Sequence, residues 1–132
     1  MTQTTCQIRV RYAETDSMGV VYYGNYLTWF EVGRTDLLRQ LGHSYREIEE
    51  TEGIRLPVIE ARCRYHKPAR YDDLVDILTR ASRPSRLQLQ FDYELSRAED
   101  GTLLASGSTL HVAVGRNGKP RRLPLKLEGL LT

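Results

Sequence analysis

The sequence predicts an α+β fold in which an antiparallel sheet of about five strands wraps around one long helix. From about Asn25 to Leu41, apolar residues recur at steps of three and four, the period of a helix with one buried face. Later segments alternate apolar with polar residues, as strands do when one face is buried. Glycine-containing turn pairs separate several of these segments and favour hairpins. An antiparallel sheet packed on one amphipathic helix is the simplest arrangement of such elements.

The helical segment shows both its buried face and its end. The face comprises Tyr26, Leu27, Phe30, Gly33, Leu37, Leu38 and Leu41. Gly33 lies on this face, where the absence of a side chain would let a sheet approach closely. Gly42 follows the segment and favours helix termination. Ser44 and Glu47 form a capping-box pattern, which predicts a short second helix over Ser44–Glu52, closed by the next glycine.

The remaining elements are predicted to be strands. One precedes the helix and four follow it: Ile8–Tyr12, Val58–Lys67, Leu74–Ala81, Leu87–Leu95 and Leu103–Val114. Asp100-Gly101 and Asn117-Gly118 are hairpin signals on either side of the last strand. Pro124 and the leucine-rich tail suggest a short terminal turn or helix.

Composition indicates one soluble globular domain covering residues 1–132, with 40% hydrophobic and 27% charged residues. No apolar run approaches the roughly 18 residues that span a bilayer, so no membrane insertion is expected. The N-terminal residues lack the basic and apolar regions of a secretory signal, which makes a cytoplasmic location the expectation. The net charge of +2 is too small to predict nucleic-acid binding.

Several common kinds of active site are excluded. The sequence has no glycine-rich phosphate loop, and Ser106-Gly107-Ser108 does not match a nucleophile elbow. The three histidines share no metal-ligand spacing, so no metal site is expected. His111 is predicted to be a packed or solvent-facing strand residue rather than a base. Cys6 and Cys63 are expected to be free thiols.

The segment Tyr12–Tyr26 contains the most informative carboxylate. Its sequence is Tyr-Ala-Glu-Thr-Asp-Ser-Met-Gly-Val-Val-Tyr-Tyr-Gly-Asn-Tyr, and Asp16 lies between the first predicted strand and the helix. One interpretation is an ordinary turn aspartate that accepts backbone N–H groups. The other is a catalytic carboxylate that attacks an acyl group or activates water for that attack.

This segment resembles the signature of the 4-hydroxybenzoyl-CoA thioesterase family of hotdog proteins, especially the small bacterial acyl-CoA thioesterases associated with the Tol–Pal envelope system. The shared features are the aspartate, a glycine three residues later, paired aromatic positions and Asn-Tyr entering the helix. The resemblance continues through Glu31 and Arg34 and resumes at Tyr65–Asp73 and Gly118–Pro124. It implies a hotdog fold and hydrolysis of acyl-CoA, with coenzyme A as part of the substrate and no separate cofactor.

The resemblance also implies roles for particular residues. Asp16 would be the base or nucleophile, and the backbone N–H groups of Tyr23 and Gly24 would form the oxyanion site. Free N–H groups at a helix N-terminus are suited to that task because the helix dipole is positive there. Glu31 matches an acidic helix position in the family and would orient the loop, although an i,i+3 pair with Arg34 explains it equally well.

Basic residues in the later motifs suggest a contact with the nucleotide of coenzyme A. The resemblance places Arg86, Lys119 and Arg122 near the nucleotide-contacting positions of the family, with Arg122 the strongest candidate. Guanidinium groups bind phosphates in bidentate fashion. The alternative is a solvated positive face with no ligand.

Three competing functions are considered. An acyl-thioester hydratase or dehydratase on the same fold would present aspartate and histidine together, but no histidine occurs between Met1 and Gln40. A non-catalytic acyl-CoA-binding module is a second possibility. A single-stranded nucleic-acid binder would interleave aromatic residues with a basic groove, whereas the tyrosines here concentrate in the motif or on apolar strand faces.

The expected partners are acyl-CoA and further copies of the chain, in a homodimer or a dimer of dimers. In the resembled fold two sheets join edge to edge, and the substrate enters between subunits. Asp16 would then face strand residues of the other subunit, near Glu60–Arg64 or the Arg70–Asp73 turn. The acyl group, aliphatic or aromatic, is left open.

Overall fold

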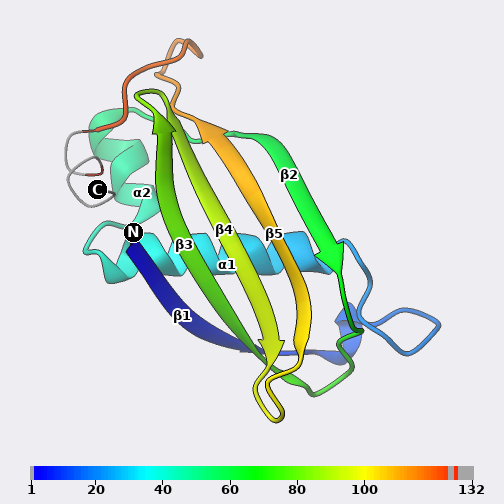
Figure 1. The fold of residues 1–132 in the computed structure, drawn as a ribbon. Helices are drawn as coiled ribbons and strands as arrows, with labels where there is room; N and C mark the ends of the chain where they lie inside the picture. Colours follow the sequence, from blue (N-terminus) through cyan, green and yellow to red (C-terminus); the bar gives the residue numbers. More distant parts are fainter. Residues whose placement is uncertain (1, 125–126, 128–132) are drawn as a thin grey trace.

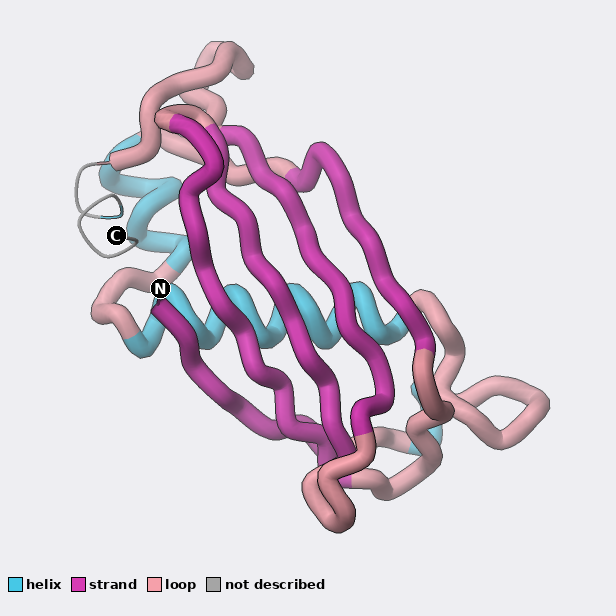
Figure 2. Tube along the Cα trace, viewed as in Figure 1, coloured by secondary structure: helices cyan, strands magenta, loops and turns pink. Residues whose placement is uncertain are grey.

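In the computed structural model, which describes residues 2–124 and 127, a five-stranded antiparallel sheet curves around one long helix (Figures 1 and 2). The strand order is β1-β3-β4-β5-β2. The main elements are β1 (Thr2–Arg9), α1 (Asn25–Gln40), β2 (Val58–Tyr65), β3 (Leu74–Ser85), β4 (Gln88–Arg97) and β5 (Leu103–Val112). The predicted α+β class, with its sheet wrapped on a central helix, is confirmed.

Residues that lack bulk allow α1 to lie close to the sheet. A Cβ on Gly33 would lie 2.7 Å from Ile77 Cγ2 and would also clash with Thr79 Oγ1, so the predicted close approach is confirmed. About one turn before Gly33 in α1, the Phe30 ring stacks on Tyr93 with ring centroids 4.2 Å apart. A Cβ on Gly107 of β5 would lie 2.8 Å from the Phe30 ring. The helix and sheet therefore meet through two glycines and one aromatic stack.

The buried face of α1 differs from the predicted one at its N-terminal end. Leu27 is 41% exposed, whereas Trp29, which the pattern had not included, is 2% exposed. The period identifies a face that packs on a sheet, but the first turn of α1 is also covered by the loop that precedes it. Trp29 is buried there, and its indole N–H donates a hydrogen bond to Glu14 of that loop.

The short second helix begins and ends where predicted. α2 (Tyr45–Glu47) is capped by Ser44, whose Oγ accepts a hydrogen bond from the Glu47 N–H at 3.0 Å. The chain then continues as a π-helical turn, η2 (Ile48–Glu52), and Gly53 ends it with a φ of +64°. The prediction of one regular helix over Ser44–Glu52 is correct in extent, but its second half is π-helical.

A first strand before α1 is confirmed, but its predicted bounds, Ile8–Tyr12, are wrong at both ends. β1 ends at Arg9, and Tyr12–Glu14 form a 3-10 turn (η1) in which Tyr12 is 76% exposed. β1 instead begins at Thr2 because its backbone pairs with β3 throughout, from Thr2 opposite Ala81 to Arg9 opposite Leu74. This strand forms a sheet edge, where backbone pairing does not require a strongly apolar face.

The hairpin turns agree with the prediction, since Gly101 and Gly118 adopt φ values of +72° and +77°. The terminal turn or helix predicted after Pro124 lies almost wholly outside the described residues. Within residues 2–124 and 127, no helix combines the length and apolar character needed to cross a membrane.

The two sheet edges are β1 and β2, and β2 is the more exposed. Val58, Ile59 and Tyr65 on this strand are 45%, 53% and 46% exposed. An open edge offers unpaired backbone groups to another strand. The sheet therefore presents a surface at β2 that another chain can extend.

We expect Gly33→Ala to lower the free energy of unfolding by about 1–3 kcal/mol, because the new methyl group overlaps Ile77 and Thr79. Denaturant unfolding measures the change. Thr28→Ala, at an exposed position of the same helix, is the control and should be close to neutral. An unchanged midpoint for Gly33→Ala would contradict the close packing.

Candidate active site

Asp16 begins a tight turn between η1 and α1. Its Oδ1 accepts hydrogen bonds from the N–H of Met18 at 2.8 Å and of Val20 at 3.4 Å. Gly19 closes the turn with a φ of +80°. Among the described residues, no hydrogen bond engages the second carboxylate oxygen, Oδ2. The turn interpretation of Asp16 thus holds for one oxygen, while the other remains available for chemistry.

Glu14 fixes this loop against the helix. Its Oε1 accepts the Arg11 N–H at 2.8 Å, and its Oε2 accepts the Trp29 indole N–H at 3.0 Å. Its carbonyl accepts the Tyr22 N–H and the Asn25 side-chain amide, at 2.9 and 2.8 Å. Burial alone would raise the pKa of Glu14, but the hydrogen bonds from Arg11 and Trp29 together lower it. Glu14 therefore acts as a buried anion that joins the loop to α1.

The N-terminus of α1 has free donors beside this loop. Its N-cap, Gly24, supplies no side-chain hydrogen bond, and the Asn25 side chain is used by the Glu14 carbonyl instead. Within the described chain, the N–H groups of Tyr23 and Gly24 take part in no hydrogen bond. Such groups, at the positive end of a helix dipole, are suited to stabilising an anion.

A cleft of about 320 Å³ contains both Asp16 and Tyr23. Its other walls are mainly apolar or aromatic and come from Met18, Val20, Val21, Tyr26, Tyr65 and Pro68. The Tyr65 hydroxyl donates to the Tyr23 carbonyl at 3.1 Å. Burial and the neighbouring Cys63 raise the pKa of Tyr65 to about 12, so this hydroxyl stays protonated and remains a donor. Tyr65 thus attaches the end of β2 to the entrance of α1.

His66 lines the same cleft, and the sequence prediction had missed it. Its Nε2 lies 2.9 Å from Ser106 Oγ. The argument against a hydratase considered only histidines close to Asp16 along the chain. Distance along the chain was no guide, because the end of β2 folds back beside the loop. Tyr65–Lys67 were predicted only as the end of a strand and as part of a motif in the family resemblance.

Glu31 lies apart from Asp16 within the chain. It is absent from the Asp16 cleft and lines a second cavity, toward the other end of α1. Its Oε1 lies 3.9 Å from Arg34 Nη2, which agrees with the alternative of an i,i+3 pair. No recorded contact joins Glu31 to the Asp16 loop.

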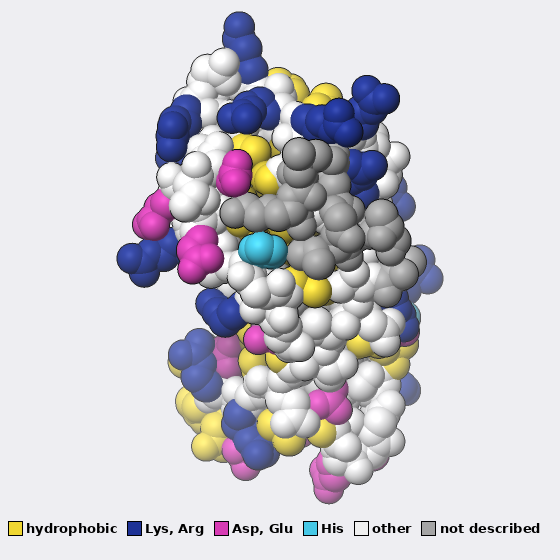
Figure 3. All heavy atoms as spheres, turned by 90° about the vertical axis from the view of Figure 1, so that its left-hand side faces the viewer, with side chains coloured by type: hydrophobic (Ala, Val, Ile, Leu, Met, Phe, Trp, Pro, Cys, Tyr) yellow, Lys and Arg dark blue, Asp and Glu magenta, His cyan; other side chains and the backbone are white. Residues whose placement is uncertain are grey.

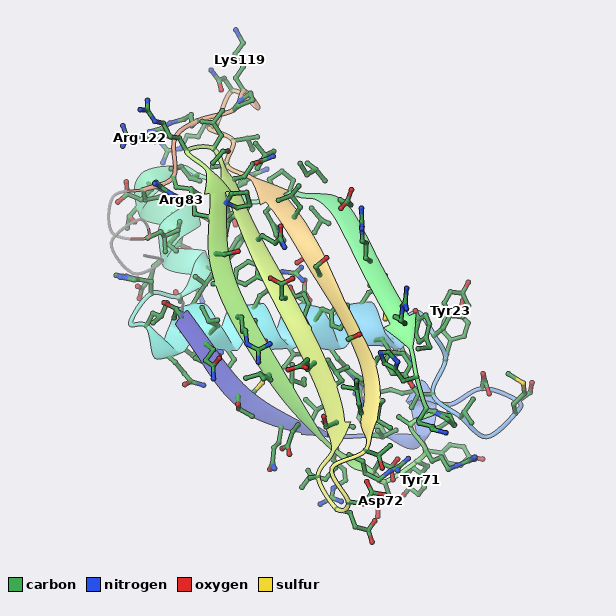
Figure 4. All side chains as sticks on the ribbon, in the orientation of Figure 1. Tyr23, Tyr71, Asp72, Arg83, Lys119 and Arg122 are labelled. Atoms are coloured by element: carbon green, nitrogen blue, oxygen red, sulfur yellow. The ribbon has the colours of Figure 1, made fainter. Side chains whose placement is uncertain are left out.

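Arg86, Lys119 and Arg122 come together at the far end of the sheet. Arg86 lies in the turn between β3 and β4, and its carbonyl accepts the Leu123 N–H at 3.2 Å. Figure 3 shows Lys and Arg side chains gathered at the upper end of the molecule, and Figure 4 places Lys119 and Arg122 there, opposite Tyr23. We call these three residues and Arg83 the basic end. It is separated from the Asp16 cleft by the length of β5, about 30 Å for ten residues.

The other candidate residues lie outside the Asp16 cleft. His111 is buried, with Nδ1 2.9 Å from the Leu56 carbonyl, which confirms its prediction as a packed residue. Cys6 and Cys63 are free thiols, as predicted. Over residues 2–124 and 127, no three His, Cys, Asp or Glu side chains are placed to bind a metal ion.

Comparison with known proteins identifies relatives across most of the chain. The family model described as "Thioesterase superfamily" matches residues 18–104. The acyl-CoA thioester hydrolase YbgC of Escherichia coli is 35% identical over 118 residues, which cover 89% of this chain and 87% of that protein.

Two solved structures are also similar. The DHNA-CoA thioesterase of Staphylococcus aureus has a TM-score of 0.87 at 41% identity, over 93% of this chain and 82% of that one. Slr0204, a 1,4-dihydroxy-2-naphthoyl-CoA thioesterase from Synechocystis, has a TM-score of 0.92 at 27% identity, over 98% and 95% of the two chains. These similarities support the family resemblance that the motif predicted.

The lowered pKa of Glu14 predicts a specific loss of stability in acid. A carboxyl group whose pKa is lower in the folded state stabilises the fold above its unfolded value, and the gain disappears as pH falls through the folded value. Glu14→Gln should therefore lower the free energy of unfolding by about 1–3 kcal/mol at neutral pH. The difference should shrink as pH falls below the ordinary pKa of a glutamate, because the group becomes protonated first in the unfolded chain and then, at its lowered pKa, in the fold. A pH-independent difference in urea titrations would show that the charge of Glu14 has no such role.

Proposed function

The chain belongs to the thioesterase superfamily, and we propose that it hydrolyses acyl-CoA to a free acid and coenzyme A, with Asp16 as base or nucleophile. One observation carries the assignment of the site. A carboxylate with one oxygen held by backbone N–H groups and the other free lies in the same cleft as the N-terminus of α1.

The arrangement suits attack on a thioester carbonyl. Asp16 Oδ2 would either take a proton from the attacking water or attack the carbonyl carbon itself. In both cases negative charge develops on the carbonyl oxygen, and the N–H groups of Tyr23 and Gly24 would stabilise it. The sulfur of coenzyme A then leaves as a thiolate and takes up a proton from Asp16 or water. If Asp16 itself attacked, the acyl group would remain on its carboxylate as an anhydride, which a water molecule would then hydrolyse to the free acid. The apolar walls of the cleft would strengthen these interactions by excluding water.

The separation of the basic end from Asp16 supports an active unit larger than one chain. If coenzyme A contacts both, they must belong to different subunits. Two copies that pair antiparallel through their β2 edges would form a two-fold dimer. The Tyr65 end of β2 would then lie beside the Val58 end in the other subunit.

This pairing would also bring the basic end of one subunit toward the Asp16 cleft of the other. Arg55, just before β2, bridges to Val114, and Val114 bridges to Pro120. The segment that carries Lys119 and Arg122 is therefore attached next to the start of β2. Because the start of β2 in one subunit lies beside its end in the other, each site would combine Asp16 from one chain with Lys119 and Arg122 from its partner. The proposed hydrolysis uses no cofactor besides the coenzyme A of the substrate. Glu31, which lines the cavity near the start of β2, would lie on the partner's side of the site.

We expect Asp16→Asn to lower kcat by about 100- to 10,000-fold, since it removes the anion but keeps the acceptor for Met18 and Val20. Release of free thiol from a panel of short, long, branched and aromatic acyl-CoAs is the measurement. Asp36→Asn, on α1 and outside the Asp16 cleft, is the matched control.

Three results would overturn the assignment: full activity of Asp16→Asn, loss of wild-type activity in a chelator, or hydration of enoyl-CoA without thiol release. The last result would favour the hydratase, for which His66 in the cleft is the structural argument.

Arg122→Ala should raise KM for acyl-CoA several-fold, to about tenfold, with a smaller effect on kcat. For an acyl-pantetheine substrate, which lacks the nucleotide, KM and kcat should be the same in Arg122→Ala as in the wild type. Arg46→Ala, an exposed arginine on α2, serves as the control and should leave both substrates unaffected. Equal effects of Arg122→Ala on the two substrates would mean that Arg122 is structural.

A further inference from the structure

A second cavity, of about 240 Å³, lies between α1 and the start of β2. Leu38, Leu56, Val58 and Phe91 give it apolar walls. Its polar side chains come from Arg34, Thr35, Tyr45, His111 and, at the exposed mouth, Glu31. The donor and acceptor directions of their hydrogen bonds determine which ligand groups the cavity can bind.

A chain of hydrogen bonds runs behind the cavity. His111 Nδ1 lies 2.9 Å from the Leu56 carbonyl, and its Nε2 lies 2.8 Å from Thr109 Oγ1. Thr109 Oγ1 lies 2.6 Å from the Tyr93 hydroxyl, which accepts a hydrogen bond from Arg34 Nη1 at 3.5 Å. Burial lowers the pKa of His111, so the ring is neutral.

The direction of every bond in this chain can be deduced. The Leu56 carbonyl only accepts, so His111 Nδ1 carries the proton and Nε2 must accept from Thr109. The Thr109 proton is then in use, so the Tyr93 hydroxyl donates to Thr109. Tyr93 oxygen is left to accept from Arg34. The chain therefore turns an acceptor lone pair of the Tyr93 oxygen toward the Arg34 guanidinium.

Of the remaining polar side chains, Arg34 and Tyr45 have donors left for a ligand, while the Thr35 hydroxyl can donate or accept. Arg34 has five N–H groups. Its recorded partners are Tyr93 and, at 3.9 Å, the carboxylate of Glu31, which is 65% exposed. The Tyr45 hydroxyl accepts the Leu56 N–H at 2.9 Å, so its own proton is left to donate. A half-buried cation with such weak compensation favours a ligand that supplies an acceptor oxygen.

We propose that this cavity binds the acyl group and selects substrates whose acyl group carries an acceptor oxygen away from the thioester, with Arg34 as the specificity-determining donor. Tyr45 would be a second donor, and Tyr93, Thr109 and His111 position Arg34. The inference rests on the proposed function and its dimer. Within one chain the cavity and the Asp16 cleft lie apart, because Val58 of the cavity and Tyr65 of the cleft are at opposite ends of β2. Antiparallel pairing of two β2 edges places the cavity of one subunit beside the cleft of its partner.

The test compares hexanoyl-CoA with 6-hydroxyhexanoyl-CoA and adipoyl-CoA, which have the same chain length and end in a hydroxyl or a carboxylate. The variants are Arg34→Met, which removes the donor, and Arg34→Lys, which keeps a charged donor should Arg34→Met fail to fold. Arg39→Met, an exposed position on the same helix that does not line this cavity, is the control.

For the wild type and Arg39→Met, we expect kcat/KM to be higher for at least one oxygenated substrate than for hexanoyl-CoA. Arg34→Met should reduce that preference by about 10- to 100-fold, and Arg34→Lys by less. A preference that survives both Arg34 variants, or a wild type that prefers hexanoyl-CoA to both oxygenated substrates, would overturn the inference.

Binding of the corresponding CoA thioethers, which cannot be hydrolysed, separates this inference from the proposed function. Calorimetry should show tighter binding of an oxygenated thioether to the wild type and loss of that difference in the Arg34 variants. If thioethers bind this way but no thioester is hydrolysed, the cavity assignment stands and the thioesterase proposal fails. If hydrolysis occurs but all three thioethers bind equally, the cavity assignment fails alone.

Discussion

The position of Asp16 depends on Glu14. The carboxylate of Glu14 holds Arg11 on one side and Trp29 of α1 on the other, while its carbonyl holds Tyr22 and Asn25. These four bonds fix the loop from η1 to the first turn of α1 as one unit. A buried anion with donors on both oxygens is costly to disrupt, because any lost partner leaves charge unsatisfied. The proposed nucleophile and the proposed oxyanion donors keep their relative positions for this reason.

Much of the fold could be predicted because its signals are local. The period of α1, the alternation in β4, the cap at Ser44 and the turns at Gly101 and Gly118 each depend on a few adjacent residues. The extent of β1 could not be predicted in this way. It is set by pairing with β3, about seventy residues away, and the Thr and Gln residues involved have no distinctive pattern.

The site was predictable in part for the same reason. Asp16 and Tyr23 share one short motif, and the structure places both in one cleft. Glu14 looked like an ordinary loop residue, since its role comes from an indole fifteen residues later. His66 and the chain from Arg34 to His111 depend on strand register, which brings together residues from different elements. Sequence patterns contain little information on such contacts.

The Asp16 cleft and the basic end lie at opposite ends of the sheet, and the proposed reaction needs both. The central claim is therefore that each site is shared between two subunits. Mixing Asp16→Asn chains with Lys119→Glu/Arg122→Glu chains tests it directly, with acyl-CoA kept well below KM. Random exchange into two-fold dimers would make roughly one site in four intact, combining Asp16 from one chain with the basic end of its partner. We predict that hydrolysis in the mixture rises well above the sum of the separate variants, to about a quarter of the wild-type rate. A mixture of exchanged subunits that shows only this sum would contradict a site shared between chains.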